Sequence, residues 1–140
     1  MEGSLFSRDR LVTLDAVRAA RANMPHAIRR TPVVPVARDS AEVGRETLFL
    51  KCENLQVTGA FKVRAVFNVM HYLTAEQKAK GVVLASSGNF AQGFAFAGKT
   101  LGVPITVVML AATRPYKIQG TEGYGAEVYL CGTDALARQP

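Results

Sequence analysis

The sequence predicts an α/β protein whose parallel sheet carries helices on both faces. Short apolar segments alternate with helical segments between residues 82 and 130, and this alternation is typical of strand–helix–strand units. The apolar segments are continuous rather than interleaved with polar residues, as expected for strands covered on both faces. Each crossover between them is expected to be right-handed. Because the chain stops soon after the third apolar segment, we expect the sheet to be incomplete.

The first half of the chain predicts two helices and two extended segments. Residues 13–24 carry apolar side chains at helical spacing, and residues 33–36, which include a proline, suit an edge or connecting strand. Residues 46–52 predict a strand, and residues 60–73 predict the second helix after a glycine turn. That helix places four apolar residues near one face: Phe61, Ala65, Val69 and Tyr72.

The second half predicts three strands and two helices in strict alternation. A serine- and glycine-containing loop, Ser86-Ser87-Gly88, follows the first strand and precedes a helix rich in small residues. In chain order, the elements span residues 82–85, 89–101, 105–110, 113–123 and 126–130. Such a succession is expected to bring the three strands side by side in one parallel sheet.

Composition and charge are those of a globular protein and exclude several classes of function. Hydrophobic residues make up 49% and charged residues 20% of the chain, and no apolar run reaches the roughly 18 residues that cross a bilayer. With no apolar stretch of signal-peptide length at the start, a cytoplasmic location and no membrane partner are expected. The basic residues behind the net charge of +6 are scattered, so we expect a small anion rather than nucleic acid as partner. Two separated cysteines and two isolated histidines predict no metal site.

Lys62 is the first candidate for chemistry because it lies in the first turn of the helix that follows the glycine turn. Free backbone N–H groups and the helix dipole favour an anion at such a place. Phe61 beside it would desolvate the lysine amine, and a neutral amine is the form that attacks an aldehyde to make a Schiff base. For a lone lysine, the simpler interpretation is a solvated helix residue.

The second candidate is the loop Ser86-Ser87-Gly88 with Asn89, which joins a strand to a helix. Backbone and hydroxyl donors converge at such a helix start, where a carboxylate or a phenolate can bind. Gln92 lies one turn further along the same helix. An ordinary serine and asparagine helix cap is the alternative interpretation of this pattern.

The string Glu53-Asn54-Leu55-Gln56, followed by Thr58-Gly59-Ala60-Phe61-Lys62-Val63-Arg64, resembles the cofactor-lysine signature of fold-type II pyridoxal-phosphate enzymes. These enzymes share the tryptophan synthase β-like fold. The match is to the branch of serine/threonine dehydratases (ammonia-lyases) and serine racemases, since Val63 after the lysine disfavours the cysteine synthase branch. The resemblance covers about residues 31–132. It implies that pyridoxal 5′-phosphate is the cofactor.

The resemblance also implies a role for each candidate residue. Lys62 would bind the cofactor and move the substrate α-proton, and Phe61 would pack beside the cofactor ring. Asn89 would donate a hydrogen bond to the ring hydroxyl, and Ser87 would lie across the cofactor from Lys62. The substrate carboxylate would be held by the loop and the helix after it: Ser86, Ser87, Gly88 and Gln92.

The reaction implied by the resemblance is α,β-elimination, the deamination of L-threonine or L-serine to a 2-oxo acid and ammonia. Serine racemisation is the near alternative, because Ser87 could return a proton from the opposite face. A catalytically silent fragment or pseudoenzyme is a further alternative. Phe90 stands where the family most often has histidine; it either packs or selects substrates with an apolar side chain. Lys117 is interpreted as a residue of a solvated helix face.

By the same resemblance, residues 1–80 belong to the large cofactor domain and residues 81–140 form most of a truncated small domain. The loop that cradles the cofactor phosphate and the group that contacts the pyridine nitrogen are expected downstream of this chain. A homo-oligomer is expected for the full-length protein.

Overall fold

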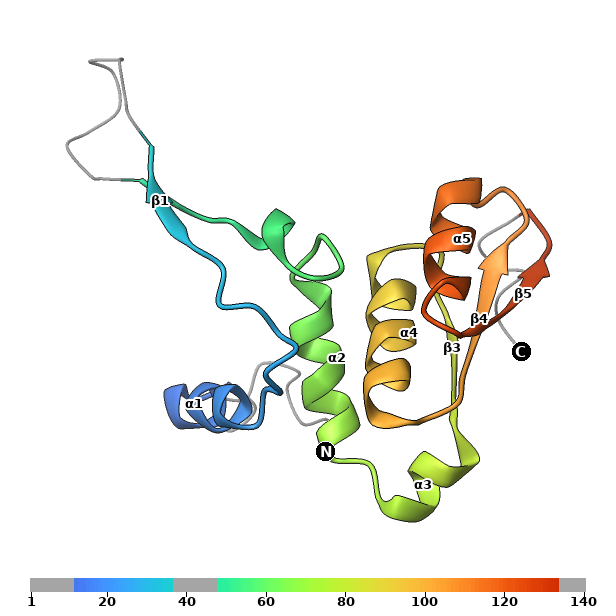
Figure 1. Cartoon of the computed structure of the whole chain (residues 1–140), viewed down its shortest axis with the longest axis horizontal. Helices are drawn as coiled ribbons and strands as arrows, with labels where there is room; N and C mark the ends of the chain where they lie inside the picture. Colours follow the sequence, from blue (N-terminus) through green and yellow to red (C-terminus); the bar gives the residue numbers. More distant parts are fainter. Residues whose placement is uncertain (1–11, 37–47, 134–140) are drawn as a thin grey trace, which may run out of the picture.

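The structure is a computed structural model that describes residues 12–36 and 48–133 of the chain. Helices and short strands come first, and three strands alternate with two helices in the second half (Figure 1). In chain order the elements are α1 (Leu14–Ala22), β1 (Val33–Pro35), β2 (Phe49–Lys51), the 3₁₀ turn η2 (Glu53–Leu55), α2 (Lys62–His71), α3 (Ala75–Lys80), β3 (Val82–Ala85), α4 (Asn89–Leu101), β4 (Ile105–Leu110), α5 (Pro115–Glu122) and β5 (Glu127–Cys131).

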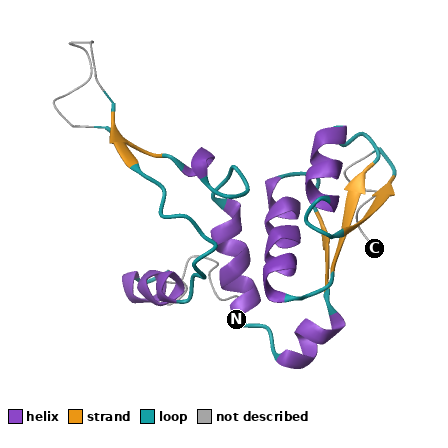
Figure 2. Ribbon diagram, in the orientation of Figure 1, coloured by secondary structure: helices purple, strands orange, loops and turns teal. Residues whose placement is uncertain are grey.

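The second half forms a parallel sheet in the strand order β3-β4-β5. Strands β1 and β2 make a separate antiparallel pair, in which Val34 lies opposite Leu50 (Figure 2). The parallel sheet with its helices confirms the predicted α/β class. The predicted bounds of β3, α4 and β4 are also confirmed residue for residue. Glycines before α4 and after it, Gly88 and Gly102, mark the two ends of that helix.

In the described residues, helices α4 and α5 lie on one face of the sheet and contact each other. Ile105, Val107 and Met109 of β4 point toward this face and are buried. On the opposite face Val83 is 74% exposed. Helical cover is therefore seen on one face rather than on both, because adjacent strands joined in sequence by crossovers of the same hand place successive helices on the same side.

The main core lies between α2, α4 and β4. Small residues of α4 let its neighbours come close: a Cβ atom on Gly93 would lie 3.1 Å from Val66 Cγ2 and 3.4 Å from Val63 Cα. The buried residues of α2 and α4 that share this core are Val63, Val66, Phe67, Met70, Ala91, Phe94, Ala95 and Ala97. The predicted boundary between the large and the small domain, at residue 80, lies between these two helices in the sequence. It stays a prediction.

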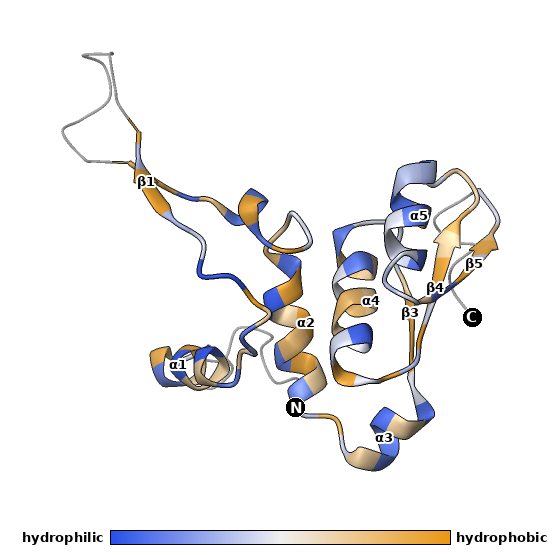
Figure 3. Ribbon diagram, viewed as in Figure 1, coloured by the Kyte–Doolittle hydropathy of each residue, from blue (hydrophilic) through white to orange (hydrophobic). Residues whose placement is uncertain are grey.

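The four apolar residues expected near one face of α2 are not the ones that form its buried side, and α2 packs through other residues. Tyr72 is 68% and Phe61 56% exposed, whereas Val63 and Val66 are fully buried. Apolar residues recur along α2 (Figure 3), some of them exposed and some buried, so periodicity alone cannot decide which side meets α4. The fit of Val63 and Val66 against Gly93 decides it.

Helix α3 is absent from the sequence prediction, although its start carries a recognisable signal. The Thr74 hydroxyl accepts from the Gln77 N–H at 3.2 Å, and the Gln77 side chain accepts from the Thr74 N–H at 2.8 Å. This is a capping box. Helix α1 is capped in a related way by Thr13, whose hydroxyl accepts from the Ala16 N–H. None of the described helices is long and apolar enough to span a membrane.

Candidate active site

Helices α2 and α4 lie side by side and run in the same direction (Figure 1). Val63 in the first turn of α2 meets Gly93 in the second turn of α4. Further along, the rings of Phe67 and Phe96 meet edge to face with centroids 6.1 Å apart. Lys62, the first residue of α2, therefore lies at the same end as the loop before α4. The carboxyl ends of the parallel strands open at this end, which is where α/β proteins bind ligands.

The helices that begin at this end are not capped by side chains. Phe61, Gly88 and Arg114 precede α2, α4 and α5, and none of them makes a side-chain capping hydrogen bond in the described residues. The peripheral helices α1 and α3, in contrast, both have threonine caps. A Cβ atom on Gly88 would meet nothing within 4 Å, so the space before α4 is open. The backbone N–H groups at these helix starts are therefore left to bind an anionic cofactor or substrate.

Lys62 is exposed in the described residues, and its ammonium lies 5.1 Å from the centroid of the Phe61 ring. Phe61 itself is 56% exposed. The expected desolvation of the lysine by Phe61 is therefore not seen in this structure. The contact between ammonium and ring is a cation–π interaction, and it leaves the end of the Lys62 side chain accessible to a ligand.

The two serines of the loop make different contacts. The Ser87 hydroxyl accepts a hydrogen bond from the Leu110 N–H at 3.2 Å, which ties the loop to the end of β4. The Ser86 hydroxyl accepts from the Gly88 N–H at 3.4 Å, within the loop. A hydroxyl that accepts in this way still has its own hydrogen to donate. Gln92 lies against Gly120 of α5, where an added Cβ atom would come within 2.7 Å of Gln92 Nε2.

Asn89 is held by a residue that the sequence prediction assigned to a solvated face. Lys117 donates from Nζ to Asn89 Oδ1 at 2.8 Å, so α5 contributes directly to the start of α4. The contact is exposed, so Lys117 lies at the surface as predicted and in addition binds Asn89. The contact joins residues 28 positions apart, and only the packing of α5 on α4 brings them together.

Phe90 packs on its own helix. Its ring meets the Phe94 ring edge to face, with centroids 5.0 Å apart, as residues one turn apart on a helix can. Phe90 remains 36% exposed. The contact agrees with a packing role and leaves an apolar surface at the start of α4, beside Asn89.

Glu53 and Arg64, on either side of Lys62 in the sequence, form a bidentate ion pair. Arg64 donates from Nε to Glu53 Oε2 at 2.9 Å and from Nη2 to Oε1 at 2.8 Å. The Thr31 hydroxyl donates to Oε1 at 2.5 Å. The hydrogen bonds from Arg64 are the main reason that the pKa of Glu53 falls to about 2. This pair fixes the start of α2 against the turn that precedes it.

Gln56 anchors the same turn from the other side. Its side chain is buried and forms a closed pair with the backbone of Arg29: Oε1 accepts from the Arg29 N–H at 2.9 Å, and Nε2 donates to the Arg29 carbonyl at 2.9 Å. Arg64 donates to that same carbonyl. Sequence reasoning missed this role. The polar residues of the lysine signature thus include a scaffold that holds the chain around Lys62, as well as Lys62 itself.

Glu53→Gln is expected to lower the free energy of unfolding at neutral pH by about 1–3 kcal/mol, since Arg64 loses its charged partner. The pKa of Glu53 is lowered from 4.5 to about 2 in the folded chain, so its contribution is present above pH 4.5 and is lost as the pH falls toward 2. The test is to measure the free energy of unfolding of the parent and of Glu53→Gln by urea unfolding, from neutral pH down toward pH 2. The difference in unfolding free energy should shrink toward zero on acidification, and a difference independent of pH would contradict it.

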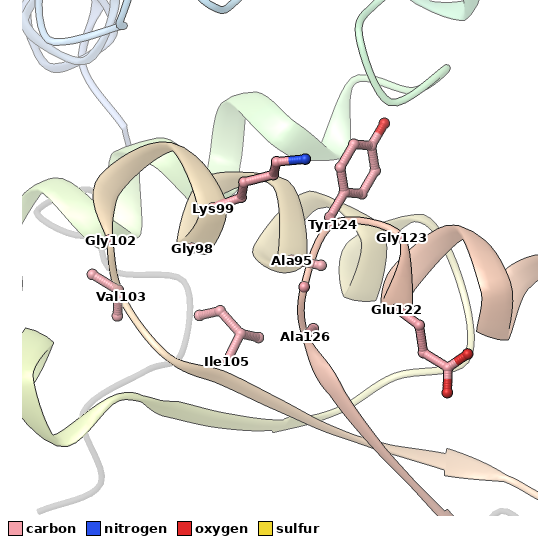
Figure 4. A pocket seen from close by; sticks show the side chains of 11 residues that line it. Ala95, Gly98, Lys99, Gly102, Val103, Ile105, Glu122, Gly123, Tyr124 and Ala126 are labelled. Atoms are coloured by element: carbon pink, nitrogen blue, oxygen red, sulfur yellow. The ribbon is translucent and has the colours of Figure 1, made fainter.

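A cavity lies at the opposite end of α4 (Figure 4). It has a volume of about 410 Å³, and its lining includes Gly98, Lys99 and Tyr124 but none of the predicted site residues. A wider hollow between α1 and α2 is lined by several basic residues, including Arg29 and Arg64, which the scaffold around Glu53 already uses. Neither cavity coincides with the open end where Lys62 and Asn89 lie.

Comparison with known families identifies the family of the chain. The family model described as pyridoxal-phosphate dependent enzyme matches residues 24–139. The chain belongs to this family. The match includes every predicted site residue from Phe61 to Gln92, and enzymes of the family depend on pyridoxal phosphate.

Among curated proteins, this member of the pyridoxal-phosphate dependent enzyme family is similar to the catabolic L-threonine dehydratase TdcB of Staphylococcus aureus (strain USA300). The two are 43% identical over 122 residues, which cover 87% of this chain and 35% of the relative. The chain thus spans about a third of the length of the curated relatives that it matches.

Solved structures of relatives share the fold. Maize serine racemase is 36% identical, with a TM-score of 0.81 over 89% of this chain and 38% of its own. A threonine deaminase from the organism abbreviated T.th. is 35% identical, with a TM-score of 0.75 over 91% of this chain and 40% of its own. The resemblance to fold-type II pyridoxal-phosphate enzymes is thereby confirmed. The similarity includes a dehydratase and a racemase, so it does not by itself fix the reaction.

Proposed function

We propose that the protein carrying this chain uses pyridoxal 5′-phosphate, bound through Lys62, to deaminate L-threonine or L-serine by α,β-elimination. The products are a 2-oxo acid and ammonia. The observation that carries the proposal is the shared position of Lys62 and the uncapped start of α4 at one open end of two packed helices. The identity of 43% with a catabolic L-threonine dehydratase supports this choice of reaction.

When bound, the cofactor supplies the electron sink that stabilises negative charge at the substrate α-carbon. Lys62 Nζ would take the proton from the α-carbon as a general base and give it to the departing β-hydroxyl, which would leave as water. The backbone N–H groups at the start of α4, with Ser86, Ser87 and Gly88, hold the substrate carboxylate. The Asn89 amide donates to the ring hydroxyl of the cofactor, Gln92 assists in binding the substrate, and Phe61 packs beside the ring. Each of these roles is a proposal for the residue named.

Serine racemisation is the second candidate, supported by the similarity to maize serine racemase. The Ser87 hydroxyl accepts from the Leu110 N–H and keeps its own hydrogen. In a racemase it would return that proton to the α-carbon on the face opposite Lys62. Elimination does not need this step.

Ser87→Ala separates the two reactions. In the full-length protein supplied with pyridoxal phosphate and L-serine, we expect the variant to retain deamination within about tenfold and to lose racemisation by about a hundredfold or more. The measurements are 2-oxo acid release and the appearance of D-serine. Thr100→Ala, an exposed hydroxyl of α4 outside the site, serves as the control. If the parent protein forms D-serine faster than the 2-oxo acid, the racemase is the better assignment.

The activity of these 140 residues alone is a separate matter, because the chain spans 35% of its curated relative. We propose that the phosphate-binding loop and the contact to the pyridine nitrogen lie in the part of the relatives beyond this match, and that the full-length protein is a homo-oligomer. A catalytically silent fragment is the alternative for the isolated chain. The test is to titrate pyridoxal phosphate into this chain and into a longer one and to follow the absorbance of the lysine-bound cofactor. A signal from the longer chain alone indicates a truncated site, and no signal from either indicates an inactive family member.

A further inference from the structure

Lys117 and Asn89 meet where the first turn of α5 crosses the start of α4. The ammonium of Lys117 donates to Asn89 Oδ1 at 2.8 Å. One turn along both helices, Gly120 lies against Gln92, and a Cβ atom at Gly120 would come within 2.7 Å of Gln92 Nε2, so that the Gln92 side chain would have to shift. The buried Thr121 hydroxyl donates to the Lys117 carbonyl at 2.9 Å and fixes this turn of α5. The contact between Lys117 and Asn89 is therefore set by the packing of two helices.

The chemistry of the contact fixes the orientation of the Asn89 amide. A lysine ammonium can only donate, so the atom that it contacts has to be the amide oxygen. The amide nitrogen of Asn89 then points away from Lys117, with its two hydrogens free to donate. Without Lys117, the oxygen and nitrogen of this exposed amide could exchange places by rotation about one bond.

The charge of Lys117 has no acidic partner in the described part of the chain. The ion pairs recorded there join Arg18 with Asp15, Arg64 with Glu53, and Lys80 with Glu76. Besides Asn89, the Lys117 ammonium lies over the Tyr116 ring, 5.7 Å from its centroid. The charge is therefore not neutralised by a carboxylate and adds to the positive potential of the uncapped α4 start.

We propose that Lys117 is a positioning residue that holds the Asn89 amide with its N–H groups directed at the ring hydroxyl of bound pyridoxal phosphate. The inference rests on the proposed role of Asn89 in the site. Lys117 acts through Asn89, and its positive charge strengthens the donor character of the amide by polarising its carbonyl group.

The test is the dissociation constant for pyridoxal phosphate in the full-length protein, measured by titrating the absorbance of the lysine-bound cofactor. Lys117→Met is expected to raise this constant about threefold to tenfold, the factor that corresponds to the net contribution of one exposed hydrogen bond. In an Asn89→Ala background, the same substitution should raise it no further, because the amide that Lys117 orients is gone. Lys117→Arg keeps a charged donor and should recover most of the affinity.

Lys99→Met is the matched control, since Lys99 is an exposed lysine in the last turn of α4, at its far end. It should leave the dissociation constant unchanged. The inference is overturned if Lys117→Met binds the cofactor as tightly as the parent does. It is also overturned if Lys117→Met raises the dissociation constant by the same factor in the Asn89→Ala background. If the parent protein shows no lysine-bound absorbance at all, the proposed function itself fails. If Asn89→Ala weakens binding and Lys117→Met does not, only the inference about Lys117 fails.

Discussion

Replacing Lys62 by alanine is expected to lower turnover of L-threonine or L-serine by about a thousandfold or more in the full-length protein. In the proposed mechanism, the substitution removes both the amine that binds the cofactor and the base that takes the α-proton. Folding should be unaffected, because Lys62 is exposed and its recorded contact in the described residues is with the ring of its neighbour Phe61. The measurements are 2-oxo acid release under saturating cofactor and the far-ultraviolet circular dichroism of both proteins.

Lys99→Ala is the matched control for Lys62→Ala, since both residues are exposed lysines of helices in the described chain. The control should keep parental turnover. A Lys62→Ala protein that is folded and turns over substrate at a rate near that of the parent would contradict the assignment of Lys62.

Gly98→Ala is expected to lower the free energy of unfolding by about 2–3 kcal/mol. An added Cβ atom would collide with the Ile105 side chain and lie 2.7 Å from the carbonyl oxygen of Val103. Ile105 is buried at the start of β4, and the Val103 oxygen belongs to the backbone, so neither can move aside cheaply. The strain exceeds the benefit that alanine usually brings to a helix interior.

Urea unfolding of the parent and of Gly98→Ala measures this effect. Lys99→Ala changes the adjacent, exposed residue of α4 and should leave the unfolding free energy within about 0.5 kcal/mol of the parent. A Gly98→Ala protein at least as stable as the parent would show that α4 and β4 do not pack as closely as the structure has them.

The strands and α4 could be predicted from the sequence because local patterns determine them. The run Val82–Ala85 and the run Ile105–Leu110 are continuous apolar segments between loops, and both are strands at these bounds. Helix α2 shows where such patterns stop being sufficient. It has apolar residues on two sides. The side that is buried is the one that fits against Gly93 of α4, a helix that comes later in the sequence.

Part of the candidate site could likewise be predicted from the sequence, and part of it could not. The signature around Lys62 indicates the family, which the family match confirms, and it is the basis for proposing Lys62 as the cofactor lysine. The same signature does not reveal that Gln56 and Arg64 hold the backbone of Arg29, because those contacts join segments far apart in the sequence. The Lys117 contact with Asn89 was missed for the same reason. The lack of side-chain caps on α2, α4 and α5 also becomes visible only when their N-terminal N–H groups are located.

The central claim is that Lys62 is the residue that binds the cofactor. The most direct measurement is borohydride reduction of the protein loaded with pyridoxal phosphate, which makes the lysine–cofactor linkage permanent, followed by peptide mass spectrometry. We expect the added mass on the peptide that contains Lys62 and its absence in Lys62→Ala. Stoichiometric label on another lysine, such as Lys51 or Lys117, with Lys62 unmodified would contradict the assignment.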